Sequence, residues 1–347
     1  MWSLFSKKML GIDIGTASIK VAEVSRFGKS KKLENYGELK TAYLTQGKSS
    51  NGMLDPKAAA EAIRSVMNEA RITTKRAVIS IPDFFTFCTS FDIPTTNAKE
   101  IHGIIQYNAS QYITLPIAEV TLDWQVTPNL TAGSKNSSRV FLVAVPNQVV
   151  EEYKNIARMA GLDLYALEAE VFGITRSLIK DPSKTVCLID VGAESSTINI
   201  VDRNSLERSY SFNFGSNKAT ALLAANLKID TTAAEQIKQK EGLASSKKEV
   251  TDALISIFQP LVVNIKNTSA EFTKKNQRPI EEYYLTGGTA NMPGLKDYFL
   301  KNLSKPILIP NYFAGISHPK PLEKTLQEMS PGFSAAIGVA LGGLETI

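Results

Sequence analysis

The sequence contains few of the residues that build metal centres or disulfide frameworks. Its 347 residues include two cysteines and two histidines. Cys88 and Cys187 are too few for a disulfide scaffold, and together with His102 and His318 they lack the spacing of a zinc site. These scarcities exclude a small disulfide-rich secreted class and favour a reducing compartment.

Long hydrophobic runs are also absent. No apolar stretch reaches the roughly 18 residues that a membrane-spanning helix needs, and the most apolar segment, 333–344, includes three glycines. The N-terminal sequence MWSLFSKKMLGIDIG lacks the long apolar region of a signal peptide. The sequence therefore predicts a cytoplasmic protein.

The sequence also has no large excess of positive or negative residues. The 39 lysines and arginines outnumber the 34 aspartates and glutamates by five, and they form only short, scattered runs such as residues 29–32. We interpret these runs as solvated loop tips, with contact to anionic lipid headgroups as the next alternative and nucleic acid as the last. No nucleic-acid partner is expected.

What the chain does have is an ordinary globular composition and a length typical of about two domains. Strand and helix patterns alternate along it, which predicts an α/β protein. Asp55 and Pro56 are typical of a helix start. A long helix is predicted over 250–276, with a kink or break at Pro260.

An internal repeat divides the chain into two halves. Residues 11–25 read GIDIGTASIKVAEVS and residues 188–202 read LIDVGAESSTINIVD, so that Asp190 follows Asp13 by 177 positions. Each copy is an apolar strand that ends in Asp-x-Gly, followed by a turn of small residues and an alternating strand. The repeat predicts a duplicated fold in which each half begins with a hairpin.

The turns of these hairpins are suited to binding phosphate. Glycine, serine and threonine leave backbone N–H groups open to an anion. Asp13 and Asp190 would hold Mg²⁺ through its waters, and Lys20 would reach a phosphate as a point charge. Two such hairpins that face each other would clamp a triphosphate from both sides.

A third glycine-rich segment, LTGGTANMPGL at 285–295, follows a predicted strand. Its double glycine lets a flat group approach the backbone, although an ordinary strand–helix turn has the same pattern. The Walker and Rossmann glycine signatures are both absent.

In order and spacing, GIDIGTASIK, IDVGAESSTINI and LTGGTANMPGL resemble the two phosphate motifs and the adenosine motif of the actin/Hsp70/sugar-kinase superfamily. Within it, the chain resembles the PilM family of type IV pilus assembly, which is FtsA-like. The segments that carry this closer likeness are FSKKMLGIDIG, QYITLPIAEVTLDWQV, VPNQVVEEYKNIARMAGL and FSAAIGVALGGL. The resemblance covers the whole chain.

The resemblance implies an actin-like, ribonuclease H-like duplicated fold of two lobes, with ATP and Mg²⁺ between them and an FtsA-type 1C subdomain. The expected divisions are lobe 1 (1A) at 1–83, 164–180 and 325–347, subdomain 1C at 84–163, lobe 2 (2A) at 181–221 and 285–324, and subdomain 2B at 222–284.

The resemblance also assigns site residues by position. The two phosphate motifs comprise Asp13, Gly15, Thr16 and Lys20, then Asp190, Gly192, Glu194 and Ser195. The adenosine motif comprises Gly287, Gly288, Ala290 and Asn291, and the helix that contacts ribose and base supplies Glu235 and Lys238. The second motif has one more small polar residue than many relatives, which leaves Ser195, Ser196 and Thr197 interchangeable.

The function implied is that of an ATP-binding adaptor. PilM proteins hold the cytoplasmic N-terminal peptide of PilN, an inner-membrane protein, beside 1C, and couple it to the pilus motor ATPases. The protein would thus be peripheral at the inner membrane through its partner. Asn108, Gln111 and Glu119 are the nearest candidates for positioning a catalytic water, but each fits a solvated helix face, so at most a slow ATPase is expected.

Two other functions stay open. A small-molecule kinase of the same fold would need a carboxylate base for which no motif is seen. An FtsA-like division filament would need a C-terminal amphipathic membrane helix, but residues 334–343 carry no charge and are predicted to face the core. The oligomeric state is not predicted.

Overall fold

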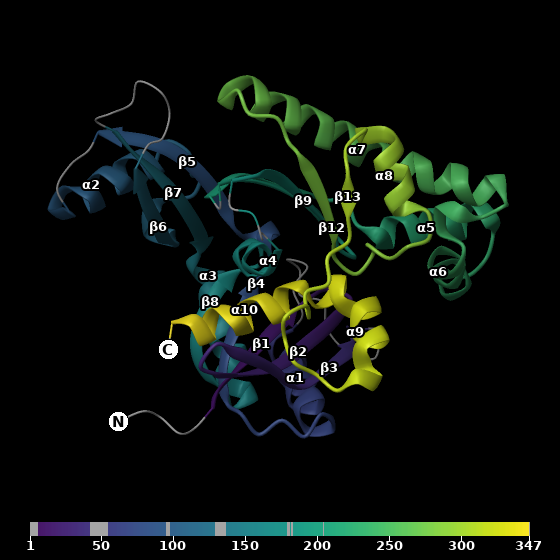
Figure 1. Ribbon diagram of the computed structural model, residues 1–347, viewed down its shortest axis with the longest axis horizontal. Helices are drawn as coiled ribbons and strands as arrows, with labels where there is room; N and C mark the ends of the chain where they lie inside the picture. Colours follow the sequence, from purple (N-terminus) through teal and green to yellow (C-terminus); the bar gives the residue numbers. More distant parts are fainter. Residues whose placement is uncertain are drawn as a thin grey trace.

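The computed structural model describes residues 6–41, 55–94, 98–128, 137–178, 181, 183–203 and 205–346. Within these ranges, no helix combines the length and the apolar character needed to cross a bilayer. The described residues form two five-stranded sheets, a three-stranded sheet and the helices that cover them (Figure 1).

The two large sheets have the same topology, with strand orders β3-β2-β1-β4-β8 and β11-β10-β9-β12-β13. In each, the first three strands are antiparallel neighbours and the last two add in parallel. The first sheet, which defines lobe 1, comprises β1 (Lys7–Ile14), β2 (Ser18–Phe27), β3 (Ser30–Lys40), β4 (Arg76–Ile81) and β8 (Asp163–Ala169). The second, which defines lobe 2, comprises β9 (Thr185–Val191), β10 (Ser196–Asp202), β11 (Ser205–Phe212), β12 (Glu282–Thr286) and β13 (Ile307–Leu308). The predicted duplication is confirmed.

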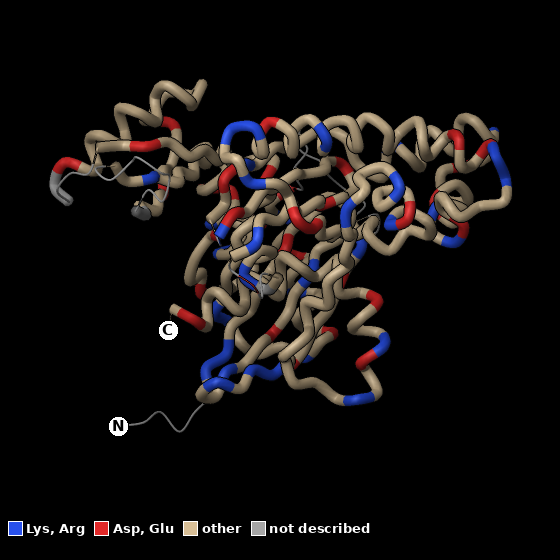
Figure 2. Tube along the Cα trace, turned by 45° about the horizontal axis from the view of Figure 1, so that its top comes forward, with Lys and Arg blue, Asp and Glu red and all other residues tan. Residues whose placement is uncertain are grey.

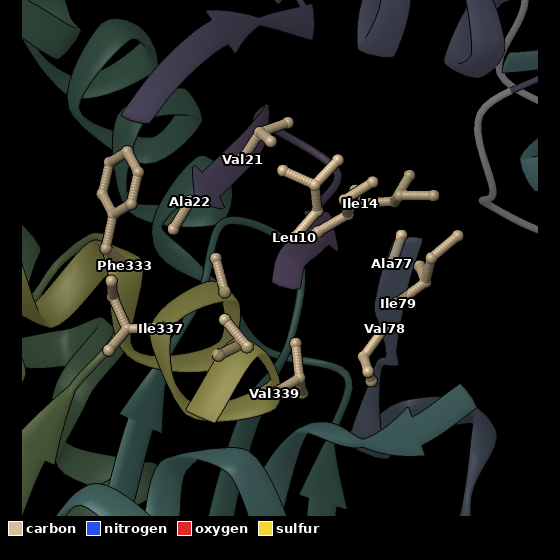
Figure 3. Packing of buried hydrophobic residues seen from close by; sticks show 14 of the residues in the cluster. Leu10, Ile14, Val21, Ala22, Ala77, Val78, Ile79, Phe333, Ile337 and Val339 are labelled. Atoms are coloured by element: carbon tan, nitrogen blue, oxygen red, sulfur yellow. The ribbon is translucent and has the colours of Figure 1, made fainter. Parts of the chain in front are cut away.

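Helix α10 (Ser334–Glu345) is the centre of the lobe 1 core. It packs on β1, β2, β4 and α4 (Glu170–Leu178), and its residues 334–344 are buried (Figure 3). Small residues permit this approach, because a Cβ on Gly11 of β1 would lie 1.8 Å from the carbonyl oxygen of Ala336. The prediction that this segment faces the core is confirmed, and the amphipathic membrane helix of an FtsA-like filament is not found in α10.

The other helices of lobe 1 are α1 (Pro56–Glu69), α3 (Asn147–Ala160) and α9 (Glu323–Met329). Asp55 caps α1 as predicted, because its Oδ2 accepts from the N–H of Ala58 at 3.0 Å. Helix α3 packs on α1 and adds buried residues to the lobe 1 core. Because α3 packs with lobe 1, the unit predicted at 84–163 ends at about residue 146 in the structure.

The chain also returns to lobe 1 earlier than predicted. Ser317 exchanges backbone hydrogen bonds with Lys31 and Leu33 beside β3, at 2.9 Å each, and Tyr312 and Phe313 are buried in the lobe 1 core. Residues from about 311 onward therefore belong with lobe 1, whereas the expected boundary was at 325. Helix α9 was not predicted.

The third unit, at the place of the predicted 1C subdomain, projects from lobe 1 (Figure 1). Its sheet has the order β5-β7-β6, and α2 covers it. The elements are β5 (Phe87–Pro94), α2 (Ala98–Ala109), β6 (Val120–Pro128) and β7 (Ser137–Pro146). It has a small core of its own that includes Phe91, Ile105 and Leu142, and β5 lies against β11 of lobe 2.

Lobe 2 is covered by α5 (Ser216–Leu227), α6 (Thr231–Lys240), α7 (Lys248–Asn276) and α8 (Leu295–Leu303). Helix α7 continues through Pro260 as one helix of 29 residues, so the predicted break is not observed. The short 3-10 turn η4 (Gly242–Ala244) connects α6 to the loop before α8, where Leu243 donates its N–H to the carbonyl of Pro293 at 2.8 Å.

Candidate nucleotide site

The two hairpin turns predicted to bind phosphate have the same geometry. The backbone N–H of Gly15 donates to the carbonyl of Ser18 at 3.1 Å, and that of Gly192 donates to Ser195 at 3.0 Å. A Cβ on these glycines would lie 3.0 and 2.9 Å from the same carbonyl oxygens. Glycine therefore lets both turns close tightly and leaves their outer backbone unobstructed.

Asp13 and Lys20 lie opposite each other on β1 and β2. The Nζ of Lys20 is 3.7 Å from Oδ2 of Asp13, and the hydroxyl of Ser80 on β4 lies 3.4 Å from the other carboxylate oxygen. Asp13 is 6% exposed. Thr16, half-buried in the turn, accepts from the Thr41 hydroxyl through its carbonyl at 2.7 Å. The first motif thus presents one buried carboxylate beside one ammonium.

The glycine-rich loop after β12 lies against Asp190. Gly287 has a φ of +89°, which favours glycine, and a Cβ there would lie 2.1 Å from Oδ1 of Asp190. Both the backbone conformation and the lack of space therefore exclude a side chain. Thr289 donates its N–H to the carbonyl of Val191 at 3.2 Å, which ties the loop to β9. Gly288 is exposed, and nothing lies within 4 Å of a Cβ built on it.

The remaining residues of the adenosine motif differ in exposure. Ala290 is 1% exposed and lies beneath the loop, whereas Asn291 is exposed. The amide of Asn291 donates to the carbonyl of Glu328 at the end of α9. Asn291 therefore connects the lobe 2 loop to the segment that returns to lobe 1.

The first phosphate motif and the adenosine motif meet at Gly332, in the 3-10 turn η6 (Ser330–Phe333). A Cβ on Gly332 would lie 3.6 Å from Cε of Lys20 and 3.9 Å from the Cα of Gly288. The side chain of lobe 1 and the open backbone of lobe 2 thus approach the same point. This convergence is what the predicted site requires.

Two further carboxylates lie at this site and were missed from the sequence. Asp83, in the 3-10 turn η2 (Asp83–Phe85) after β4, accepts from the N–H of Val171 at 3.1 Å and from the amide of Asn199 at 3.0 Å. Its own N–H donates to Glu170, which begins α4 after β8, at 3.3 Å. Asp83 follows β4, the parallel neighbour of β1, and Glu170 follows β8, the parallel neighbour of β4. Because carboxyl ends of parallel strands meet at one edge of a sheet, this position was the available signal.

Burial is the main cause of raised pKa values among the carboxylates of the site, and neighbouring negative charges add to it for Asp190 and Glu170. Burial, together with the charges of Asp83 and Asp13, raises the pKa of Asp190 to about 7, while Lys20 opposes the shift. Burial raises the pKa of Asp83 to about 6. Burial and the neighbouring charges of Asp13, Asp83 and Asp190 raise the pKa of Glu170 well above its ordinary value. These acidic groups lie close to one another, with the Lys20 ammonium beside Asp13, and a bound cation would offset the negative charge of those that are ionised.

These features fit a nucleotide with a water-held divalent cation. The donor set is oxygen-rich and acidic, as Mg²⁺ prefers, and the unobstructed turns suit phosphate. Across the described residues, no group of three or more His, Cys, Asp or Glu side chains is arranged to hold a metal ion. Asp13 and Asp190 are the residues that would hold Mg²⁺ through its waters.

Helix α6 carries both Glu235, which is half-buried, and Lys238, which is buried. Lys238 is 4% exposed, and its Nζ contacts Glu235 Oε2 at 2.7 Å, the hydroxyl of Thr220 at 2.9 Å and the carbonyl of Ser216 at 3.2 Å. Burial lowers the pKa of Lys238. This ammonium fixes α6 to α5. Contacts of Glu235 and Lys238 with ribose and base stay predictions.

The structure separates the three interchangeable residues of the second motif. Ser196 is 1% exposed and Thr197 is 6% exposed, with the Thr197 hydroxyl 3.3 Å from that of Ser211 on β11. Ser195 is half-buried in the turn itself and is the better placed for a ligand. Glu194 accepts from the amide of Asn217 at the start of α5 at 2.8 Å.

None of the three candidates for water positioning lies at the hairpin turns. Asn108 belongs to α2 and donates to the carbonyl of Ile104 in its own helix at 2.7 Å. Gln111 follows α2, and Glu119 ends the 3-10 turn η3 (Ile117–Glu119) in the same projecting unit (Figure 1). Gln111 and Glu119 are exposed and Asn108 is half-buried, in keeping with the solvated positions favoured from the sequence, and the residue that positions a catalytic water is not assigned.

Comparison with known proteins decides the family. A sequence profile described as "Type IV pilus assembly protein PilM" matches residues 11–344. The chain belongs to the PilM family. It has an actin-like fold and is a pilus assembly protein.

Solved structures agree with this assignment. A PilM–PilN type IV pilus biogenesis complex contains a chain that is 25% identical, with a TM-score of 0.85 over 97% of this chain and 98% of that one. The ethanolamine utilization protein EutJ from Carboxydothermus hydrogenoformans is 16% identical, with a TM-score of 0.58 over 97% and 90% of the two chains. MreB5 of Spiroplasma citri, bound to AMPPNP, is 14% identical, with a TM-score of 0.53 over 93% and 97%. The last two similarities concern the fold.

Proposed function

We propose that this protein is a cytoplasmic, ATP-binding adaptor of the type IV pilus inner-membrane complex. It binds the cytoplasmic N-terminal peptide of a PilN-like protein. The observation that carries the proposal is the match over almost the whole chain to PilM in a PilM–PilN complex. Contacts with pilus motor ATPases stay a prediction.

The nucleotide part of the proposal rests on the convergence at Gly332. The tight turns closed by Gly15 and Gly192 have no side chain at these positions, which suits the approach of a phosphate, and the ammonium of Lys20 beside Asp13 adds a positive charge. Gly288 leaves its backbone open to the flat adenine or ribose face. Mg²⁺ would supply the positive charge that offsets the carboxylates, held through water by Asp13 and Asp190.

Hydrolysis, if it occurs, is expected to be slow. Glu170 is the first-lobe carboxylate closest to a water-positioning role, but burial and nearby charges raise its pKa well above the ordinary value. A protonated carboxyl is a poor acceptor for a proton from water. The site therefore favours binding ATP over rapid turnover.

The third unit provides a route from the nucleotide to the partner. It is inserted in lobe 1, yet Arg139 on β7 contacts Glu207 on β11 of lobe 2 at 2.6 Å. The hydroxyl of Ser90 on β5 donates to the carbonyl of Leu206 at 3.4 Å. In addition, Asp83 joins β10 through Asn199 immediately before the chain enters β5. A change in lobe closure would therefore reposition the unit beside which the peptide is proposed to bind.

The test is binding of a labelled peptide that copies the cytoplasmic N-terminus of the PilN-like protein of the same organism. Anisotropy is measured with and without Mg·ATP, with a scrambled peptide as the control. We expect specific binding whose affinity changes with nucleotide. If ATP binds but the peptide does not in either state, the adaptor function is rejected.

A further inference from the structure

The end of the lobe 1 sheet opposite the nucleotide site is strongly basic. The strand register places Lys7 of β1 opposite Arg26 of β2, and Arg26 opposite Lys31 of β3. Directly opposed like charges destabilise a sheet. Three cations in one cross-strand row make this end of the sheet basic.

Neighbouring residues extend this row. Ala77 of β4 pairs with Leu10 of β1, which brings the residues before it to the same end of the sheet. We define the basic end as Lys7, Lys8, Arg26, Lys29, Lys31, Lys32, Lys75 and Arg76. Figure 2 shows blue segments gathered where the described chain begins.

Nearby carboxylates neutralise only part of this charge. Lys8 lies 3.5 Å from the buried Glu23, Lys31 lies 3.5 Å from Glu345, and Lys32 lies 2.8 Å from Glu34. Glu345 is shared with an arginine of α4, whose Nε is also 3.5 Å away. Asp163 also lies opposite Arg76 across β4 and β8. The eight cations of the basic end therefore outnumber the four carboxylates Glu23, Glu34, Asp163 and Glu345, which leaves a positive excess.

An exposed aromatic ring stands at the tip of the same end. Phe27 closes the β2 strand at the β2–β3 turn and is 65% exposed. Gly28 and Lys29, which follow it, are also exposed. An apolar ring set among lysines is the combination that suits the boundary between headgroups and acyl chains.

We propose that the basic end, with Phe27 at its tip, docks onto the anionic headgroup surface of a bilayer. Six of its eight cations are lysines, which act as point charges and suit a diffuse anionic surface. The guanidinium of Arg76 is already stacked over the ring of Tyr165 at 4.2 Å. The basic end is therefore less suited to nucleic acid, which arginine recognises through paired, planar hydrogen bonds to bases or phosphates.

Docking at this end is compatible with an occupied nucleotide site. Lys7 begins β1 and Asp13 lies near its other end, so the two surfaces are at opposite ends of one strand. The inference rests on the proposed function only in that a membrane-anchored partner would bring the bilayer close. A weak surface contact then acts at high effective concentration.

The experiment is co-sedimentation of the full chain with phosphatidylcholine vesicles that contain about 30 mol% phosphatidylglycerol, compared with phosphatidylcholine alone. We expect binding to the anionic vesicles, little binding to the neutral ones, and loss of binding as salt is raised. Equal binding to both vesicle types, or no binding to either, overturns the proposal.

Matched variants locate the contact. Lys29→Glu with Lys75→Glu should reduce the apparent affinity for anionic vesicles at least tenfold. Lys266→Glu with Lys305→Glu changes the net charge equally on lobe 2 and should have little effect. Equal losses in both pairs would show a net-charge effect and reject a defined surface.

Two further measurements separate the alternatives. Phe27→Ser should weaken vesicle binding without a change of charge, and an unchanged affinity would remove the ring from the proposal. A DNA duplex that binds through the basic end while anionic vesicles do not would reject the bilayer in favour of nucleic acid. Peptide binding by the Lys29→Glu, Lys75→Glu variant is expected to persist, so lipid docking and the adaptor function fail independently.

Discussion

Replacing Asp190 with asparagine should stabilise the nucleotide-free protein at alkaline pH. Burial and the charges of Asp83 and Asp13 raise the pKa of Asp190 from 3.8 to about 7. Between these two values the folded state keeps a proton that the unfolded state has released, so folding stability falls as pH rises. Above about pH 7 the full cost of the buried charge is present.

The size of the effect follows from the shift. A difference between 3.8 and about 7 corresponds to about 4 kcal/mol at most, fully expressed above pH 7. At pH 5 less than half of this cost is present. The gain in unfolding free energy from Asp190→Asn is therefore expected to be about 2–3 kcal/mol larger at pH 8 than at pH 5.

The assay is denaturant unfolding of the nucleotide-free protein at both pH values. Asp252→Asn, on the exposed surface of α7, is the matched control and should show no such difference. The same Asp190→Asn variant should lose affinity for Mg·ATP. A variant that is destabilised equally at both pH values would refute the electrostatic reasoning for this site.

The remaining predictions concern the ligand, the route to the partner and the core. Lys20→Ala should weaken Mg·ATP binding about 10- to 100-fold, because a charge-assisted phosphate contact is lost. An unchanged affinity in a fluorescent-nucleotide titration would show that Lys20 is not part of the site. Arg139→Glu should reduce the effect of ATP on peptide affinity, and adding Glu207→Arg should restore it, because the Arg139–Glu207 ion pair of 2.6 Å joins the third unit to lobe 2. An equal effect of ATP on peptide affinity in all three proteins would contradict coupling through this ion pair. Gly11→Ala should lower the unfolding free energy by about 1–3 kcal/mol, because its Cβ would lie 1.8 Å from the carbonyl oxygen of Ala336; a neutral result in thermal denaturation would count against the tight packing of α10.

Features set by local chemistry could be predicted from the sequence. Gly15 and Gly192 close turns of the same geometry, because an Asp-x-Gly turn after an apolar strand needs only short-range contacts. The start of α1 was placed correctly, since an aspartate followed by proline fixes both the capping bond and the first helical φ. The repeated strand pattern was enough to predict two sheets of one topology.

Features set by tertiary contacts could not be predicted in this way. Asp83 and Glu170 belong to no motif and become site residues only because β4 pairs in parallel with β1 and β8 pairs in parallel with β4. Helix α3 follows the third unit in sequence but packs on α1, which no local pattern indicates. A kink or a break was predicted at Pro260, yet this residue is exposed and α7 continues through it without a break.

Lys238 illustrates the same limit within a motif. Its position in the chain matches a residue expected to contact ribose or base, yet the fold buries its ammonium among Glu235, Thr220 and Ser216. A sequence pattern gives the position of such a residue, but it does not show which neighbouring groups already form an ion pair or hydrogen bonds with it.

The central claim is that ATP and the PilN-like peptide bind the same protein and influence each other. The most direct test is the affinity for Mg·ATP measured with and without saturating peptide, beside the affinity for peptide measured with and without Mg·ATP. Linkage requires one coupling factor for both titrations. The account predicts equal factors clearly different from one, whereas two ligands that bind without any mutual effect would contradict it.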